Sequence, residues 1–178
     1  DVLGQPPTYH SLPVGNAGNI TAYWKGYKEY HCEGVIKSLP KMLGFQASGA
    51  APIVLGKVVD NPETVATAIR IGNPASWKTA EAARDESGGV IDTVTDEEIL
   101  EAYQLVAKHV GYFCEPASAA SIAGIRKLAQ KDFFEQGETV VCTLTGHGLK
   151  DPDTAISVSK QPVQLPGDVD QVISTLNL

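Results

Sequence analysis

Short apolar runs alternate along this chain with longer segments in which apolar residues recur every three or four positions. Strands are predicted for the apolar runs at residues 9–14, 42–47, 90–94, 112–114 and 139–144. Helices are predicted for the segments with helical spacing at residues 20–31, 62–70, 75–84, 95–110 and 117–130. Because strands and helices alternate, the pattern indicates an α/β domain with an open, mostly parallel sheet and helices on both faces.

Two helix starts carry recognisable capping signals. Thr95 and Glu98 form a capping box, in which each side chain accepts a hydrogen bond from the other's backbone, and a helix is expected to run on to about Val110. Asn61 followed by Pro62 favours another helix start. Asp96, Glu97 and Glu98 also suggest a metal site, but capping accounts for them and no metal is predicted.

Glycine-rich turns follow two of the predicted strands, at residues 15–19 and 145–148. Ligands of parallel sheets bind at the carboxyl ends of strands, which is where both turns fall. In the first turn, Gly15, Asn16, Ala17, Gly18 and Asn19 open a helix, whose unpaired N–H groups and dipole attract an anion. Glycine and asparagine also make ordinary turns, so spacing alone leaves both interpretations open.

Composition places the chain in the ordinary globular class and limits the kinds of partner it is expected to bind. It has 178 residues, of which 43% are hydrophobic and 20% charged, enough for one sizeable core. The net charge of −7 and the pI near 5.0 argue against binding to nucleic acid or an anionic membrane surface. A small-molecule partner is therefore expected.

The cysteines and the termini suggest a cytoplasmic protein. Cys32, Cys114 and Cys142 lie far apart without metal-ligand spacing, so reduced thiols are expected, with a disulfide as the alternative. No apolar run reaches the roughly 18 residues of a membrane span, and no signal-peptide layout is found. The chain begins at Asp1 without a Met, from which we expect a fragment or a processed chain.

Five blocks of sequence, in order, resemble threonine synthase, a pyridoxal-phosphate (PLP) enzyme of the fold-type II group. They lie at residues 13–22, 26–28, 71–75, 115–120 and 145–152, and the resemblance spans about residues 8–155. The related dehydratases carry a run of glycines where this chain has Asn16 and Asn19.

The resemblance implies a fold and a reaction. The fold is the large domain of the tryptophan-synthase-β type, in incomplete form: a PLP-binding domain over residues 1–158 and a C-terminal extension over 159–178 that ends in a short helix. The reaction converts O-phospho-L-homoserine and water to L-threonine and phosphate, which makes the enzyme a PLP-dependent carbon–oxygen lyase acting on phosphates.

The resemblance also assigns cofactor contacts. Gly15, Asn16, Ala17, Gly18 and Asn19 would hold the PLP phosphate through their N–H groups. Thr145 would place its hydroxyl against the pyridine nitrogen, and residues 71–75 would lie near the ring or the substrate.

The resemblance does not supply a catalytic residue. The family's Schiff-base lysine lies in an N-terminal Ser-x-Lys-Asp-Arg motif, which this sequence lacks. Lys150 belongs to a different motif and receives no catalytic role. We therefore predict no catalytic residue in this chain, an N-terminal segment that carries the lysine elsewhere, and an isolated chain that is inactive.

Three features have a structural interpretation as well as a functional one. His147 is a catalytic base or, more simply, a loop residue between two glycines. Glu115 orients substrate or complements a helix dipole. The aromatic cluster at residues 23–30 stacks on a ligand or packs in the core or at a domain interface.

Two other functions remain open beside threonine synthase. The first is a serine or threonine dehydratase relative, and the second is a non-catalytic α/β module that binds an anion. A homo-oligomer is expected, because an exposed apolar face should remain where the lysine-bearing segment docks.

Overall fold

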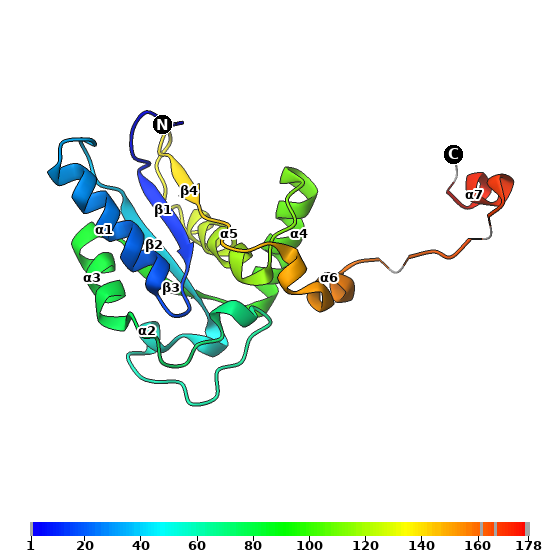
Figure 1. Cartoon of the computed structure of the whole chain (residues 1–178), viewed down its shortest axis with the longest axis horizontal. Helices are drawn as coiled ribbons and strands as arrows, with labels where there is room; N and C mark the ends of the chain where they lie inside the picture. The colour runs from blue at the N-terminus through cyan, green and yellow to red at the C-terminus, as the bar shows by residue number, and fades with distance from the viewer. Residues whose placement is uncertain (1, 161, 166, 177–178) are drawn as a thin grey trace.

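Four parallel strands form the central sheet of the computed structural model, which describes residues 2–160, 162–165 and 167–176. The strands are β1 (Tyr9–Pro13), β2 (Lys41–Ala47), β3 (Val90–Val94) and β4 (Val140–Cys142). Their order across the sheet is β3-β2-β1-β4, and every pairing is parallel (Figure 1). The predicted parallel α/β fold is confirmed.

Helices cover both faces of this sheet (Figure 1). One face carries α1 (Gly18–Cys32) and α3 (Trp77–Ser87), which enclose a core with Leu12, Ile20 and Met42. The other carries α4 (Asp96–Val110) and α5 (Pro116–Ala129), which pack on Leu43 and Phe45. Shorter helices are α2 (Pro52–Leu55), α6 (Pro152–Val158) and α7 (Val169–Leu176), the last lying apart from the sheet in Figure 1.

Small residues bring α5 close to the sheet. A Cβ on Gly124 would overlap the ring of Phe45, so only glycine allows this approach. This contact holds the later turns of α5 close against β2.

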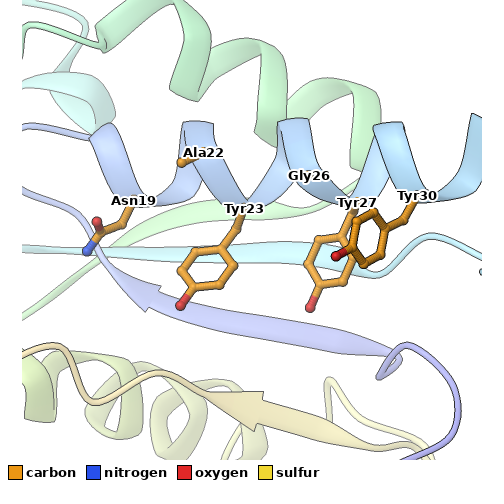
Figure 2. Close-up of a pocket in the computed structure, with 6 residues that line it drawn as sticks. All are labelled: Asn19, Ala22, Tyr23, Gly26, Tyr27 and Tyr30. Carbon is orange, nitrogen blue, oxygen red and sulfur yellow. The ribbon is translucent and has the colours of Figure 1, made fainter. Parts of the chain in front are cut away.

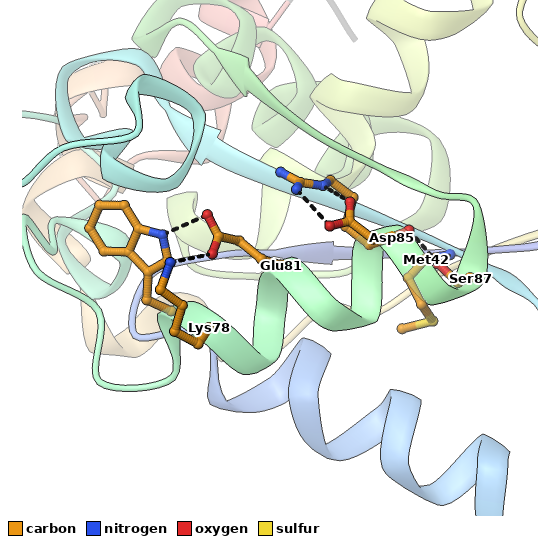
Figure 3. Close-up of polar contacts among 7 residues, drawn as sticks. Met42, Lys78, Glu81, Asp85 and Ser87 are labelled. Carbon is orange, nitrogen blue, oxygen red and sulfur yellow. Dashed lines mark hydrogen bonds and ion pairs between the residues drawn. The ribbon is translucent and has the colours of Figure 1, made fainter.

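Polar contacts fix α3 along its exposed side and at its end (Figure 3). Glu81 accepts hydrogen bonds from the Trp77 indole and from Lys78, both at 3.0 Å. At the end of the helix, Ser87 Oγ accepts a bond from the backbone N–H of Met42 at 3.1 Å, which ties α3 to β2. The start of α3 lies beside the loop that follows β1, because the N–H of Ser76, just before the helix, donates to Asn16 O at 3.2 Å.

The capping box is confirmed, while the helix predicted at 62–70 is wrong. Thr95 Oγ1 accepts from Glu98 N at 3.2 Å, and Glu98 Oε2 accepts from Thr95 N at 2.7 Å. Residues 62–70 instead form a loop with one 3-10 turn at Thr67–Ile69. The reason is Asp96, whose carboxylate accepts hydrogen bonds from the hydroxyl of Thr64 and the backbone N–H of Val65 and so draws this segment out of helical geometry.

Two predicted strands also differ from the structure. Residues 112–114 form only a single antiparallel bridge, between Cys114 and His147. The strand expected over 139–144 is shorter, at Val140–Cys142, and half-buried, because it lies at the edge of the described sheet. The extension predicted at residues 159–178 lies partly outside the described residues, and the domain boundary at 158 stays a prediction.

Candidate functional site

The two glycine-rich turns meet at one cavity of about 420 Å³, here called the cradle cavity. All six residues predicted to contact a cofactor line it. They are Gly15, Asn16, Ala17, Gly18 and Asn19, from the end of β1 and the start of α1, and Thr145, from the segment after β4. Adjacent parallel strands bring their carboxyl ends to the same edge, and that is why residues so distant in sequence converge.

The backbone of the first turn has the form of an anion site. Ala17 adopts left-handed geometry with φ of 65°, uncommon for a residue with a Cβ, and α1 begins at Gly18. Within the described part of the chain, the N–H groups of Gly15, Asn16 and Ala17 have no hydrogen-bond acceptor. The first N–H groups of α1 lack intrahelical acceptors as well, so several donors gather at one end of the helix dipole.

The two glycines of the cradle are required, or tolerated, for different structural reasons. A Cβ on Gly15 would lie 2.8 Å from Cα of Ile69, so Gly15 permits close packing against the loop at 68–69. A Cβ on Gly18 would meet nothing within 4 Å. Gly15 therefore shapes the wall of the cavity, whereas Gly18 leaves the space beside the helix end open.

Asn16 serves mainly as a brace. Its Oδ1 accepts a hydrogen bond from the N–H of Ala75 at 2.7 Å, and its backbone O accepts from Ser76 N at 3.2 Å. The block 71–75 therefore supports the turn from behind. Ala68 and Ile69, which sequence reasoning missed, line the cavity in its place.

Thr145 is held by a serine on α5. Ser118, fully buried, lies with its Oγ 3.1 Å from Thr145 Oγ1. The N–H of Gly146 donates to the same Ser118 Oγ at 2.8 Å. Sequence reasoning gave Ser118 no role; the available signal was that Ser118 and Ser121, three residues apart, place hydroxyls on one face of a helix that begins at a strand end.

An ion pair closes another side of the cavity. Glu115 is 5% exposed, and its Oε2 lies 2.9 Å from Lys150 Nζ. The two side chains both line the cradle cavity. Glu115 also precedes α5 as its N-cap, without a capping hydrogen bond from its side chain. Lys150 therefore balances a buried carboxylate at the cavity, a role sequence reasoning did not assign to it.

His147 behaves as a loop residue. Its Nδ1 accepts a hydrogen bond from Leu149 N at 3.2 Å, and its ring packs edge-on against Phe113 with 5.5 Å between centroids. It does not line the cradle cavity. The structural alternative is thus favoured for His147.

A second cavity, of about 490 Å³, opens along α1 and is here called the tyrosine cavity (Figure 2). It is lined by Asn19, Ala22, Tyr23, Gly26, Tyr27 and Tyr30. Tyr23 is 41% and Tyr30 56% exposed, while Trp24 is buried and donates to Glu86 Oε2 at 2.7 Å. The aromatic cluster is therefore split between core packing and an open apolar surface.

Beneath the tyrosines lies a buried histidine. The Tyr27 hydroxyl is 3.1 Å from His10 Nδ1, and His10 Nε2 is 2.8 Å from Thr143 Oγ1. Desolvation lowers the pKa of His10 from 6.5 to about 4, because burial disfavours the imidazolium. His10 is therefore neutral at physiological pH and ties β1, α1 and the segment after β4 together.

Residues 1–146 match the family model described as pyridoxal-phosphate dependent enzyme. The chain belongs to this family. The predicted cofactor is confirmed at the level of the family.

In the described residues no helix is long and apolar enough to cross a membrane, no cluster could hold a metal ion, and all three cysteines are free.

Among curated proteins the chain is similar to threonine synthases, which confirms the resemblance. It is 60% identical to threonine synthase of Mycobacterium leprae (strain TN), over 97% of this chain and 49% of that protein. It is 61% identical to the Halalkalibacterium halodurans enzyme, over 94% and 48% respectively. The chain thus spans about half the length of the curated relatives it matches.

A solved structure supports the fold. The crystal structure of a T.th. threonine deaminase superimposes with a TM-score of 0.64 and 22% sequence identity, covering 82% of this chain and 52% of that one. At this identity the likeness establishes the architecture alone.

The residues of the cradle cavity fit pyridoxal phosphate. A phosphate needs several N–H donors, and those of Gly15, Asn16 and Ala17 have no acceptor among the described residues. A pyridine nitrogen needs one polar partner, and the Thr145 hydroxyl lies on the lining of the same cavity. The open space beside Gly18 leaves room for the anion.

Proposed function

We propose that this chain supplies the cofactor-binding half of a threonine synthase, a carbon–oxygen lyase that forms L-threonine and phosphate from O-phospho-L-homoserine and water. The observation that carries the proposal is the convergence of residues 15–19 and Thr145 on one cavity. Similarity to threonine synthases over nearly the whole chain supports the choice of reaction.

Each part of the cavity has a proposed task. The N–H groups of Gly15 to Asn19 bind the cofactor phosphate, and Asn16 holds the turn against Ala75. Thr145 orients the pyridine ring through its hydroxyl. When bound, pyridoxal phosphate supplies an electron sink for carbanion chemistry at the substrate. The walls at Ala68 and Ile69 help to exclude water from that side.

The lysine that binds the cofactor covalently is proposed to come from sequence outside these 178 residues. The isolated chain should then bind pyridoxal phosphate without a covalent bond and show no turnover. Borohydride treatment followed by peptide mass spectrometry checks this. A cofactor-modified lysine within residues 1–178 would contradict it.

The reaction is tested on the complete natural protein loaded with pyridoxal phosphate. With O-phospho-L-homoserine we expect equal amounts of threonine and phosphate. Ammonia and a 2-oxo acid from L-threonine or L-serine, without phosphate release, would favour the dehydratase alternative. Cofactor binding without either reaction would favour the non-catalytic anion-binding module.

Three further expectations belong to this proposal. The cofactor domain is proposed to occupy residues 1–158, with an extension at 159–178. A homo-oligomer, expected from the apolar face where the lysine-bearing segment docks, and a cytoplasmic location, expected from the reduced cysteines, remain predictions. Size-exclusion chromatography with light scattering measures the first, and cell fractionation the second.

A further inference from the structure

The hydroxyl of Thr145 can face the cavity in two ways, either donating a proton or offering a lone pair. Which way it faces decides whether its partner is an unprotonated ring nitrogen or a protonated one. The hydrogen bonds of Ser118 bear on this choice, because Ser118 does not line the cavity and touches Thr145 from behind.

Ser118 Oγ carries one proton and two lone pairs. One lone pair is occupied without ambiguity, because the N–H of Gly146 can only donate to it, at 2.8 Å. The proton then has two possible acceptors, Thr145 Oγ1 at 3.1 Å and Gly146 O at 3.3 Å.

Two observations favour Thr145 as the acceptor. The distance is shorter, and Gly146 O already accepts a hydrogen bond from the N–H of Glu115 at 2.9 Å. In the described part of the chain, Thr145 Oγ1 has no other hydrogen-bond partner. With Ser118 donating, the proton of Thr145 is left free to point into the cavity.

We propose that Ser118 is a positioning residue that turns the Thr145 hydroxyl proton toward the cofactor's ring nitrogen and thereby keeps that nitrogen unprotonated. This deepens the proposed function and depends on it, since Thr145 must contact the ring. The opposite orientation, with Thr145 donating to Ser118, would present a lone pair and favour a protonated ring.

The test uses the complete natural protein loaded with pyridoxal phosphate labelled with ¹⁵N in the ring. The pH at which the ring ¹⁵N resonance shifts toward its protonated value is measured by NMR. In Ser118→Ala the Thr145 hydroxyl is free to turn, so this pH should rise by about one unit and cofactor binding weaken about fivefold.

Two variants define the role more narrowly. Ser118→Thr restores a hydroxyl and should return the resonance to its original behaviour. Ser121→Ala removes another buried hydroxyl of α5, one that donates to Ser118 O at 2.8 Å and does not touch Thr145, and should leave the resonance unchanged.

Ser118→Cys distinguishes a loss of folding from a loss of the hydrogen bond, because it keeps a side chain of similar size at this position with a weaker donor. A smaller rise in the same direction supports the proposal if Ser118→Ala does not fold. The role of Ser118 would be overturned if the ring titration changed in Thr145→Val but not in Ser118→Cys or in a folded Ser118→Ala. In that case the contact of Thr145 with the ring would still stand. No change in Thr145→Val would instead remove the ring contact on which the proposed function relies.

Discussion

The cradle cavity and the tyrosine cavity share Asn19 and helix α1, yet they differ in what they offer a partner. On its α1 side the cradle cavity is lined by backbone at the start of the helix, where N–H groups lack acceptors among the described residues and the dipole is positive. The tyrosine cavity lies along later turns, where the backbone is satisfied and only side chains are presented.

The difference shows how one helix serves two kinds of contact. An anion suits the first turn, because the N–H groups of residues 15–17 have no acceptor among the described residues. An apolar partner suits the later turns, because Tyr23 and Tyr30 expose aromatic surface there. The comparison gives four predictions, which probe the two cavities separately.

The largest effect is expected from Gly18→Asp, which places a carboxylate in the cradle. A side chain there meets no atom within 4 Å, and an acid in the first helical turn favours folding, so the variant should fold. Repulsion of the phosphate should weaken binding of pyridoxal phosphate about 100-fold or more. Fluorescence titration measures the affinity.

The matched control is Gly26→Asp, on the same helix in the tyrosine cavity. A side chain there is also free of contacts within 4 Å. Cofactor affinity should remain as it was. Equal losses in both variants would show that general charge, and not the cradle, governs binding.

The second prediction concerns the pH dependence of folding stability that arises from His10, beneath the tyrosine cavity. The unfolded chain protonates His10 near pH 6.5, whereas the native state does so near pH 4. The unfolded state therefore binds more protons between these values, and stability falls as the pH decreases through them. We expect a loss of about 2 kcal/mol between pH 7 and pH 5 from this group.

Urea unfolding at several pH values measures this loss. His10→Gln keeps hydrogen-bonding atoms without titrating, so the difference in slope between the two proteins isolates His10 from the carboxylates. Parallel pH dependence in both would show that His10 is not held neutral by burial.

The third prediction separates the half-buried Tyr27 from the exposed Tyr30. Tyr27→Phe removes the hydroxyl beside His10 Nδ1 and should lower the free energy of unfolding by about 1 kcal/mol. Tyr30→Phe, at a position 56% exposed, should change it little. Cofactor affinity should be unaffected in both, and a large loss in either would link the two cavities.

The smallest effect is expected at Asn16. Asn16→Ala removes the bond to Ala75 N, but both residues are exposed, so water replaces it and stability should fall by about 0.5 kcal/mol. Cofactor titration in parallel shows whether the side chain is only a brace. A loss of affinity as large as that of Gly18→Asp would make the Asn16 side chain a direct ligand of the cofactor.

Local signals in the sequence predicted much of the fold and part of the site. The capping box at Thr95 and Glu98 lies within one turn, and so do the donors of the first glycine turn, which is why both could be recognised without a structure. The alternation of strands with helices along the chain likewise predicted the parallel sheet.

The features that could not be predicted depend on partners distant in sequence. Residues 62–70 have helical composition, yet Asp96 supplies acceptors that favour a loop. Ser118 meets Thr145 only because α5 packs closely on the sheet through Gly124. Such contacts are set by tertiary packing and leave no periodicity to detect.

Strand β1 carries His10 near its start and leads into Gly15 at its end, so a single five-residue strand connects both cavities. Insertions and deletions should therefore be poorly tolerated between these residues. One added residue would reverse the faces of all that follow it, so that either the histidine leaves its partners or the cradle leaves the sheet edge. The loop at residues 33–40 lines neither cavity and meets Tyr30 through backbone hydrogen bonds from Val35 and Ile36 to Tyr30 O, so it should accept changes in length more readily than β1 does.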